Sequence, residues 1–476
     1  MIHLNQRSST PLYEQIYTQL SRDILLGVYP PASKLPSIRE LAEELRCSRN
    51  TVDAAYRLLA QEGFTASKPG SGFIVEDMSG ETAIATRAAT WREEQQASEP
   101  TLPSIDLAPA RYDFTYGNLE PGTFPAAAWR SILNDILLEP DLAQASSYDD
   151  DKGEWALRCE IARRAQASRD IHCSAENIIV QGGTQPTLQR LCLLFDTATD
   201  AVAMEEPGYD GARSVFEGNG FPIRLIPVTQ GADAMMAALH ASDAKLLYVT
   251  PANQFPTGGT MSPEVREGIL TWAKDTDAYI IEDDYCHEFC YRGERQPALF
   301  AQDNADRVIY LGTFSKALSP ALRISYMILP KVLRRQWDEK FSNAYPAVSW
   351  LMQEALARYL ASGQWDRHLR RLQARSRRKH TVLMDTIKRT MEGKVRVLEH
   401  GCGLHVLLEV LDGRSQGELI ALAREEGVRV YGTDRYWTTD GHTLGSCVLV
   451  GFSAIPEQDI EPGIEALARA WFTNRR

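Results

Sequence analysis

The chain has 476 residues, more than the roughly 250–300 that one hydrophobic core usually serves, so at least two folding units are expected. Hydrophobic residues make up 44% of the chain and charged residues 24%, which excludes the disordered and fibrous classes of protein. The net charge of −12 excludes a protein that is basic over its whole surface.

The negative charge is unevenly distributed along the chain. Residues 1–76 hold eight Lys and Arg and eight Asp and Glu, so the whole deficit lies in residues 77–476. DNA binding needs basic side chains on one face of a domain, not a positive charge on the whole chain. The acidic total is therefore compatible with DNA binding by the first 76 residues.

The first predicted helix begins after Pro11. Apolar residues recur at every fourth position from Leu12 to Ile24, which is the spacing of an amphipathic helix, and Gly27 ends the pattern. A second helix follows Ser37, which with Glu40 matches a capping box. Its predicted inner face consists of Ile38, Leu41, Ala42 and Leu45.

A third helix is expected to begin after Ser48 and to end at Gly63, with Val52, Ala55, Leu59 and Ala60 as its apolar face. Its first turn presents Arg49, Asn50 and Thr51. Two short helices of this kind, the second polar at its start, are typical of a helix-turn-helix. Residues 64–75 then predict a β-hairpin with a glycine-rich tip, which would be the wing.

From these patterns alone, a small helical domain that binds protein remains an alternative. The following stretches resemble the GntR superfamily winged helix: Leu35-Pro36-Ser37-Ile38-Arg39, Leu41-Ala42, Ser48-Arg49-Asn50-Thr51-Val52, Tyr56, Leu59, Glu62-Gly63 and Gly70-Ser71-Gly72-Phe73-Ile74-Val75. The resemblance implies DNA contacts from Arg39, Ser48, Arg49, Asn50, Thr51, Lys68 and Gly70. Arg49 suits bidentate bonding to guanine, and Arg39 and Lys68 suit phosphates.

A linker is predicted over residues 77–112, where apolar periodicity disappears and Thr, Ala, Glu, Gln and Pro dominate. Its length would allow the DNA-binding unit to lie far from its own body. A homodimer that exchanges domains is therefore expected. The predicted domains are residues 1–76 for the winged helix, 77–112 for the linker and 113–476 for the body.

The body is predicted to be an α/β domain with a mainly parallel sheet, because strand-like runs alternate with helical segments. The runs are residues 177–180, 201–204, 245–249, 278–281 and 308–311. Ligands in such folds lie beyond the carboxyl ends of the strands. Residues of several chemical kinds follow these runs: the phosphate-cradle turn Gly182-Gly183-Thr184, the aromatic Tyr209, the carboxylates of residues 282–284, and Thr313, Lys316 and Arg323.

This set of residues after the strand-like runs resembles that of fold-type I aminotransferases, which bind pyridoxal 5′-phosphate. The whole chain resembles MocR-type regulators, in which a body of this kind is fused to a GntR winged helix. The residues that match in order are Gly117, Phe124-Pro125, Tyr148, Gly183-Thr184-Gln185, Pro207-Gly208-Tyr209, Gln254-Phe255-Pro256-Thr257-Gly258, Glu282-Asp283-Asp284-Tyr285, Ser315-Lys316 and Arg323.

The resemblance implies a role for each matching position. Lys316 would form the Schiff base, Asp283 would pair with the pyridine nitrogen, Tyr285 would reach the ring oxygen and Tyr209 would stack on the ring. Gly183, Thr184, Thr313 and Arg323 would hold the phosphate.

Two positions depart from the aminotransferase pattern. Phe255 occupies the place of an asparagine that bonds the ring oxygen, and Asn253 is a candidate substitute. Leu449 stands where an arginine usually binds the substrate carboxylate. Arg435 either replaces that arginine as an effector contact or is an ordinary surface residue.

No metal site is expected. Cys286, His287 and Cys290 come closest to a ligand cluster, but their spacing matches no zinc pattern. The eight cysteines form no Cys-x-x-Cys pair and are expected to be reduced thiols. No stretch has the length of a membrane span and the first residues lack a signal peptide, so the protein is expected to be cytoplasmic.

Three functions agree with these patterns. The first is a transcription regulator that senses pyridoxal phosphate, or an amine or amino-acid effector, through an internal or external aldimine at Lys316. The second is a working aminotransferase with an auxiliary DNA-binding domain. The third is a winged-helix regulator whose body only dimerises. The complete cofactor constellation argues against the third and the well-formed recognition helix against the second, so the sequence favours a regulator with at most residual transaminase activity.

Overall fold

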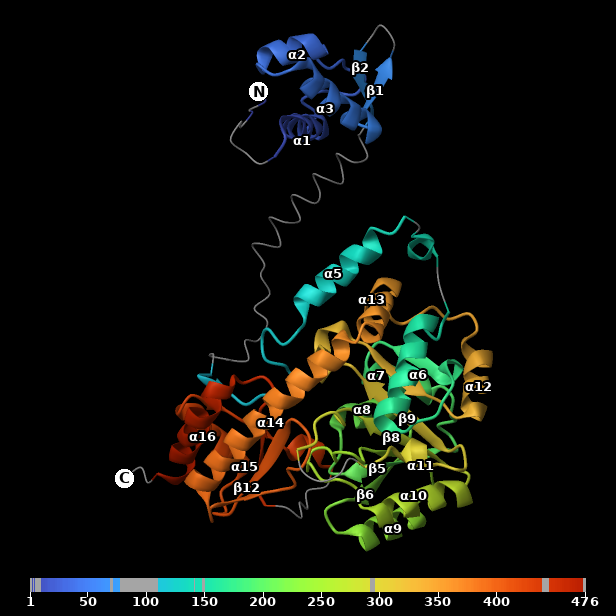
Figure 1. The fold of residues 1–476 in the computed structure, drawn as a ribbon, viewed down its shortest axis with the longest axis vertical. Coiled ribbons are helices and arrows are strands. Elements are labelled where there is room, and N and C mark those ends of the chain that lie inside the picture. The colour runs from blue at the N-terminus through green and yellow to red at the C-terminus, as the bar shows by residue number, and fades with distance from the viewer. Residues whose placement is uncertain are drawn as a thin grey trace. The chain divides into compact units, whose positions relative to one another are not determined.

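The computed structural model forms two compact units, Met1–Leu107 and Ala108–Arg476. Figure 1 traces both along the chain. The structure describes Ile2, Leu4 and residues 10–68, 72–77, 110–140, 142–147, 150–291, 296–438 and 445–473. Within these ranges, no helix is both long and apolar enough to cross a membrane.

The first unit has the three helices and the hairpin predicted for it. They are α1 (Leu12–Leu25), α2 (Ile38–Glu44), α3 (Arg49–Gln61), β1 (Thr65–Lys68) and β2 (Gly72–Val75). The capping box at Ser37 is present, and the Ser48 hydroxyl accepts a hydrogen bond from the Thr51 amide at 3.1 Å. The strands β1 and β2 pair antiparallel, with Thr65 opposite Val75.

The second unit contains a seven-stranded sheet in the order β4-β10-β9-β8-β7-β5-β6. Its strands are β4 (Ile178–Gln181), β5 (Ala201–Glu206), β6 (Ile223–Pro227), β7 (Ala244–Val249), β8 (Tyr279–Asp284), β9 (Val308–Thr313) and β10 (Ser325–Ile328). β10 runs in the opposite direction to the other six strands of this sheet, so the prediction of a mainly parallel sheet is confirmed.

Helices cover both faces of this sheet. The helices of the unit are α5 (Ala126–Leu137), α6 (Trp155–Arg169), α7 (Thr184–Cys192), α8 (Asp210–Gly218), α9 (Ala232–Ala241), α10 (Pro263–Asp275), α11 (Leu299–Gln302), α12 (Lys331–Phe341), α13 (Trp350–Ala361), α14 (Gln364–Met391), α15 (Gln416–Glu425) and α16 (Glu457–Phe472), with the short 3-10 helices η1 (Ala143–Ser146), η2 (Ala175–Asn177), η3 (Pro320–Leu322) and η4 (Asp434–Tyr436). Helices α7, α8 and α12 pack on one face of the sheet, and α9 and α10 pack on the other, where Figure 1 shows them together.

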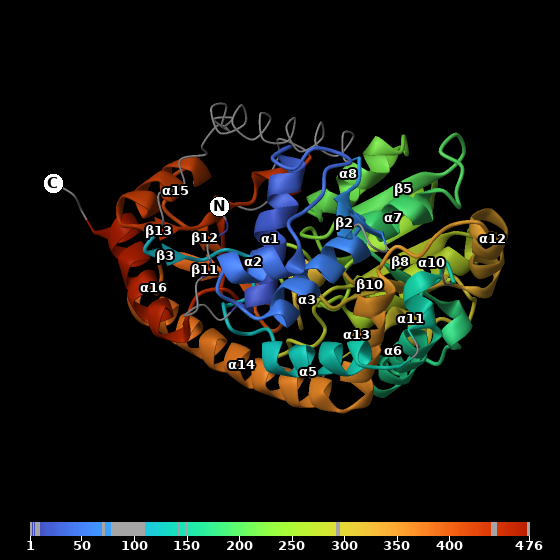
Figure 2. The ribbon, with the colours of Figure 1, turned by 90° about the horizontal axis from the view of Figure 1, so that it is seen from above.

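A smaller antiparallel sheet has the order β11-β12-β15-β14, with β11 (Val395–Val397), β12 (His405–Val410), β15 (Cys447–Gly451) and β14 (Tyr431–Gly432). β13 (Val428–Arg429) pairs in parallel with β3 (Tyr112–Asp113). Helices α14, α15 and α16 share a core with this sheet. In Figure 2 the long helix α14 runs from α16 toward α13, and so connects the small sheet to the large one.

Candidate functional site

A cavity of about 250 Å³ lies at the carboxyl ends of β7, β8 and β9, the edge of the sheet at which a ligand was expected from the sequence. Its walls are formed by Tyr116, Thr184, Gln185, Tyr209, Tyr248, Thr250, Phe255, Asp283, Tyr285, Thr313, Ser315, Lys316 and Arg323. The fold therefore brings together seven of the nine predicted cofactor residues as cavity walls. The other two predicted residues lie next to residues of the cavity wall. Gly183 is close to the Arg323 side chain, and Asn253 is hydrogen-bonded to Tyr285.

Lys316 follows the end of β9 by three residues, and its Nζ lies 4.4 Å from the centre of the Tyr116 ring. Burial lowers the pKa of Lys316 to about 8, and the positive charge of Arg323 acts in the same direction, while Asp283 opposes it. A larger fraction of this amine is therefore neutral near pH 7 than of an exposed lysine. A neutral buried amine is a nucleophile for an aldehyde.

Asp283, in β8, presents a buried carboxylate to the same cavity. Its Oδ2 accepts a hydrogen bond from the Tyr248 hydroxyl at 2.5 Å, which fixes the orientation of the carboxylate. Burial raises the pKa of Asp283 to about 6, although the Tyr248 bond and the Lys316 charge lower it. A cationic group placed against this carboxylate would relieve the cost of burying its charge.

The start of α7 and Arg323 form an anion-binding end of the cavity. Gly183 precedes α7 with φ of 112°, and its amide donates to the Ser325 hydroxyl at 3.0 Å. Thr184 in the first turn and the Arg323 side chain both face the cavity. A helix N-terminus beside a guanidinium is a suitable environment for a phosphate.

Phe255, which lines the cavity, belongs to a buried apolar cluster. Phe255, Leu407, Tyr436 and Leu449 are buried in it together. The Phe255 ring centre lies 4.8 Å from that of Tyr436 and 5.4 Å from that of Tyr116. The two departures noted in the sequence, Phe255 and Leu449, thus belong to one packed group, which their separation along the chain did not indicate.

Asn253 does not line the cavity. Its Nδ2 donates to the Tyr285 hydroxyl at 2.5 Å, and that hydroxyl donates to the Asn253 carbonyl oxygen at 3.0 Å. Asn253 therefore positions Tyr285 in this structure, and the prediction that it contacts a cofactor remains a prediction.

Arg435 lies in η4, outside the residues that line the cavity. Its side chain is 66% exposed, and its Nε lies 3.5 Å from Asp210. Its guanidinium also donates to the Tyr436 hydroxyl at 2.6 Å. Of the two interpretations of Arg435, this placement favours the surface residue that supports Tyr436.

Several cavity residues were not singled out from the sequence. Tyr248 and Thr250 lie at the carboxyl end of β7. Because ligands bind at the carboxyl ends of parallel strands, they could have been predicted from the sequence in the same way as Asp283. Tyr116 precedes Gly117, which the resemblance already included. Of the other matching positions, Tyr148 lies outside the described residues.

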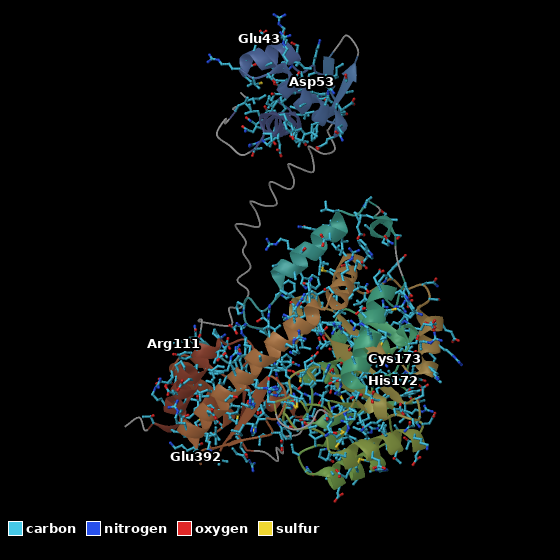
Figure 3. All side chains as sticks on the ribbon, in the orientation of Figure 1. Glu43, Asp53, Arg111, His172, Cys173 and Glu392 are labelled. Carbon is cyan, nitrogen blue, oxygen red and sulfur yellow. The ribbon has the colours of Figure 1, made fainter. Side chains whose placement is uncertain are left out.

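The predicted DNA contacts lie on α2 and at the start of α3. Arg39, Ser48, Arg49 and Asn50 are exposed and Thr51 is half-buried. Arg39 pairs with Glu43 at 3.0 Å and Arg57 pairs with Asp53 at 2.9 Å; Figure 3 labels both acidic partners. Lys68 is the last residue of β1, and Gly70 lies outside the described residues.

Comparison with known proteins matches two parts of the chain to two different families. Residues 12–75 match the model of the bacterial regulatory proteins of the gntR family, and residues 113–467 match aminotransferase class I and II. The chain is 36% identical to the HTH-type transcriptional regulator YhdI of Bacillus subtilis, over 98% of this chain and 97% of that protein. It is 30% identical to the probable rhizopine catabolism regulatory protein MocR of Rhizobium meliloti, over 99% and 96% of the two chains.

The chain belongs to the MocR-type transcriptional regulators. Among solved structures, this MocR-type chain resembles the kynurenine aminotransferase of Pyrococcus horikoshii, with a TM-score of 0.67, 24% identity and coverage of 82% of this chain and 95% of that one. It also resembles LysN, the α-aminoadipate aminotransferase of Thermus thermophilus, with a TM-score of 0.67, 25% identity and coverage of 80% and 97%. The predicted fold-type I body is confirmed.

The cavity of this MocR-type regulator fits pyridoxal phosphate. The buried amine of Lys316 suits the aldehyde, and the Asp283 carboxylate suits a protonated ring nitrogen. Arg323 and the start of α7 suit the phosphate, and Gly183 leaves room for the guanidinium, because an added Cβ would lie 2.1 Å from it.

Proposed function

We propose that this MocR-type regulator binds operator DNA through its winged helix, and that pyridoxal phosphate held at Lys316, alone or with an amine ligand, changes that binding. The observation that carries the proposal is the buried, easily deprotonated amine of Lys316 in a cavity with Asp283 and Arg323, in a chain that also contains a GntR unit. A body that only dimerised would not need this set of side chains.

Each of the cavity residues has its own role in binding the cofactor. Pyridoxal phosphate, when bound, supplies an aldehyde that reacts with primary amines and a ring that withdraws electrons. Lys316 provides the amine for attachment, and Asp283, oriented by Tyr248, holds a proton on the ring nitrogen. Thr184 and Arg323 bind the phosphate. Tyr285, which Asn253 holds by a hydrogen bond, would hydrogen-bond the ring oxygen.

The charges in the cavity support a ligand without an α-carboxylate. Among the residues that line it, only Lys316 and Arg323 are cationic, and Arg323 lies beside Gly183 at the phosphate end. Phe255 lines the cavity and packs with Leu449, which is buried outside the cavity lining. A carboxylate placed against Phe255 would lose hydration without gaining a cationic partner there. Pyridoxal phosphate itself, or a simple amine, therefore fits better than an α-amino acid.

We propose a homodimer with exchanged domains as the DNA-binding form. Two winged helices related by a two-fold axis would contact two half-sites, with α3 in the major groove. Sedimentation of the full chain with and without DNA measures this state directly. A monomer that binds a single half-site with full affinity would contradict it.

The alternative function is a working aminotransferase, which the fold of the body supports. The full chain loaded with pyridoxal phosphate can be incubated with amino acids and a keto acid while keto-acid formation is followed. A regulator is expected to show at most slow single turnovers. Steady turnover at the typical enzymatic rate of roughly 1–1000 s⁻¹ would favour the enzyme instead.

A further inference from the structure

Two cysteine thiols that take no part in the proposed function lie in contact with each other, outside the residues that line the cavity. The Sγ atoms of Cys290 and Cys402 are 3.0 Å apart, although the residues are 112 positions apart in the chain. Both side chains are partly exposed, whereas Cys192, Cys286 and Cys447 are buried.

The backbone explains why these thiols meet. Cys290 and Cys402 are opposite each other in an isolated antiparallel bridge. The bonds beside them run from the Tyr291 amide to the Gly401 carbonyl and from the Gly403 amide to the Phe289 carbonyl, both at 2.8 Å. This pattern makes Cys290 and Cys402 a non-hydrogen-bonded pair, the register in which opposite Cα atoms are about 4.5 Å apart and side chains are closest. That spacing lies within the range that a disulfide spans.

We propose that Cys290 and Cys402 are a reversible oxidation site whose oxidant is a hydroperoxide. One thiolate attacks the peroxide oxygen, the O–O bond breaks, and a sulfenic acid and one water form when the oxidant is hydrogen peroxide. The second thiol attacks that sulfur, the S–S bond forms, and a second water leaves. The two thiols lose two hydrogens in total, and the peroxide is reduced to two waters. A thiol reductant reverses the change by exchange.

The position of this pair connects it to the cavity wall. Cys290 follows β8, which carries Asp283, and Cys402 precedes β12. Next to Cys402, an added Cβ at Gly403 would lie 2.6 Å from the Asn253 side-chain nitrogen, the atom that donates to the Tyr285 hydroxyl. A disulfide would therefore tie the segment before β12 to the segment after β8, next to the contact that positions Tyr285.

The test uses the full chain, reduced, desalted and treated with hydrogen peroxide. Remaining thiols are alkylated, and the chain is digested without reductant for mass spectrometry. We expect one linked peptide pair that contains Cys290 and Cys402, about 2 Da lighter than the two reduced peptides together, and its loss on adding dithiothreitol. Amide exchange at Tyr291 and Gly403 is expected to slow in the oxidised chain, because the linkage holds their hydrogen bonds closed.

Serine variants give the matched controls. Cys290→Ser and Cys402→Ser are each expected to abolish the linked peptide and the slower exchange. Cys159→Ser, at an exposed position on α6, is expected to change neither. Recovery of Cys290 and Cys402 as alkylated thiols after peroxide has oxidised Cys159 would overturn the proposal, as would a linkage from Cys402 to Cys286. None of these readouts depends on pyridoxal phosphate or on DNA.

Discussion

The side chain of Arg323 fills the space in which a side chain at residue 183 would lie. A Cβ added at residue 183 would lie 2.1 Å from Nη2 of Arg323 and 2.8 Å from its Cζ. The backbone of Gly183 also has a positive φ of 112°, which other residues rarely adopt. The anion-binding end of the cavity therefore depends on the absence of a side chain at this position.

Gly183→Ala is expected to push the Arg323 guanidinium away from the phosphate. Loss of one charge-assisted hydrogen bond costs about 1.5–3 kcal/mol, so the Kd for pyridoxal phosphate should rise roughly 10- to 150-fold. Absorbance titration of the variant with pyridoxal phosphate measures this. Gly218→Ala is the control, since nothing lies within 4 Å of a Cβ added there. Equal affinities for both variants would contradict this account of the phosphate site.

Lys316→Ala is expected to abolish covalent attachment of pyridoxal phosphate. Borohydride reduction followed by peptide mass mapping should find the cofactor on Lys316 in the unmodified chain and nowhere in the variant. Lys388→Ala removes an exposed lysine from α14 and should leave the attachment unchanged. Reduced cofactor on another lysine of the Lys316→Ala chain, at full occupancy, would refute the assignment.

The rate of attachment is expected to depend on pH through Lys316. Burial lowers the pKa of Lys316 from 10.5 to about 8, so the reactive neutral amine is plentiful above pH 8 and scarce below it. The rate should fall about tenfold for each pH unit below about 8 and level off above it. Stopped-flow absorbance between pH 6 and 10 would show this profile. A rate that kept rising up to the pKa of an exposed lysine would show that the amine is not perturbed.

Arg49→Ala is expected to weaken specific DNA binding, because the exposed guanidinium at the start of α3 can bond guanine bidentately. Such a contact is worth about 1–3 kcal/mol, which corresponds to a roughly 5- to 150-fold loss of affinity. Arg57→Ala removes an exposed arginine two turns along the same helix, already paired with Asp53, and should have a smaller effect. Fluorescence anisotropy with operator and unrelated DNA distinguishes the two. Unchanged specificity in Arg49→Ala would exclude it as a base contact.

Arg435→Ala decides between the two interpretations of that residue. Its side chain is 66% exposed and faces Asp210, so the variant should bind pyridoxal phosphate and amines as the unmodified chain does. Arg323→Ala should lose at least roughly tenfold in cofactor affinity by the argument made for Gly183. A selective loss of the amine response in Arg435→Ala would instead make it an effector contact.

Local signals in the sequence predicted most of the fold. Ser37 and Ser48 mark the starts of α2 and α3 because their side chains satisfy amides of the first turn. Five strands of the large sheet were predicted from apolar runs. The strands β6 and β10 were missed: β6 is only partly buried, and β10 is a short strand whose antiparallel position between β4 and β9 depends on distant pairings. Glu282 to Asp284, expected after a strand, lie inside β8.

The site was predictable where residues lie at the carboxyl ends of strands and unpredictable where it depends on packing between distant segments. Asp283 is the next-to-last residue of β8 and Lys316 follows β9 by three residues, so their shared cavity could be predicted from the sequence. The joint burial of Phe255 and Leu449, the contact of Asn253 with Tyr285 and the meeting of Cys290 with Cys402 each connect parts of the chain that no local pattern relates.

In the proposed function, DNA binding depends on occupancy of the cavity at Lys316. Footprinting of the DNA upstream of the chain's own coding region, with and without pyridoxal phosphate, measures this dependence for the unmodified chain and for Lys316→Ala. Pyridoxal phosphate is expected to alter the footprint, or its midpoint concentration, for the unmodified chain only, since coupling requires different affinities for the two states. Identical footprints of the unmodified chain with and without pyridoxal phosphate and candidate amines, at saturating cofactor, would contradict it.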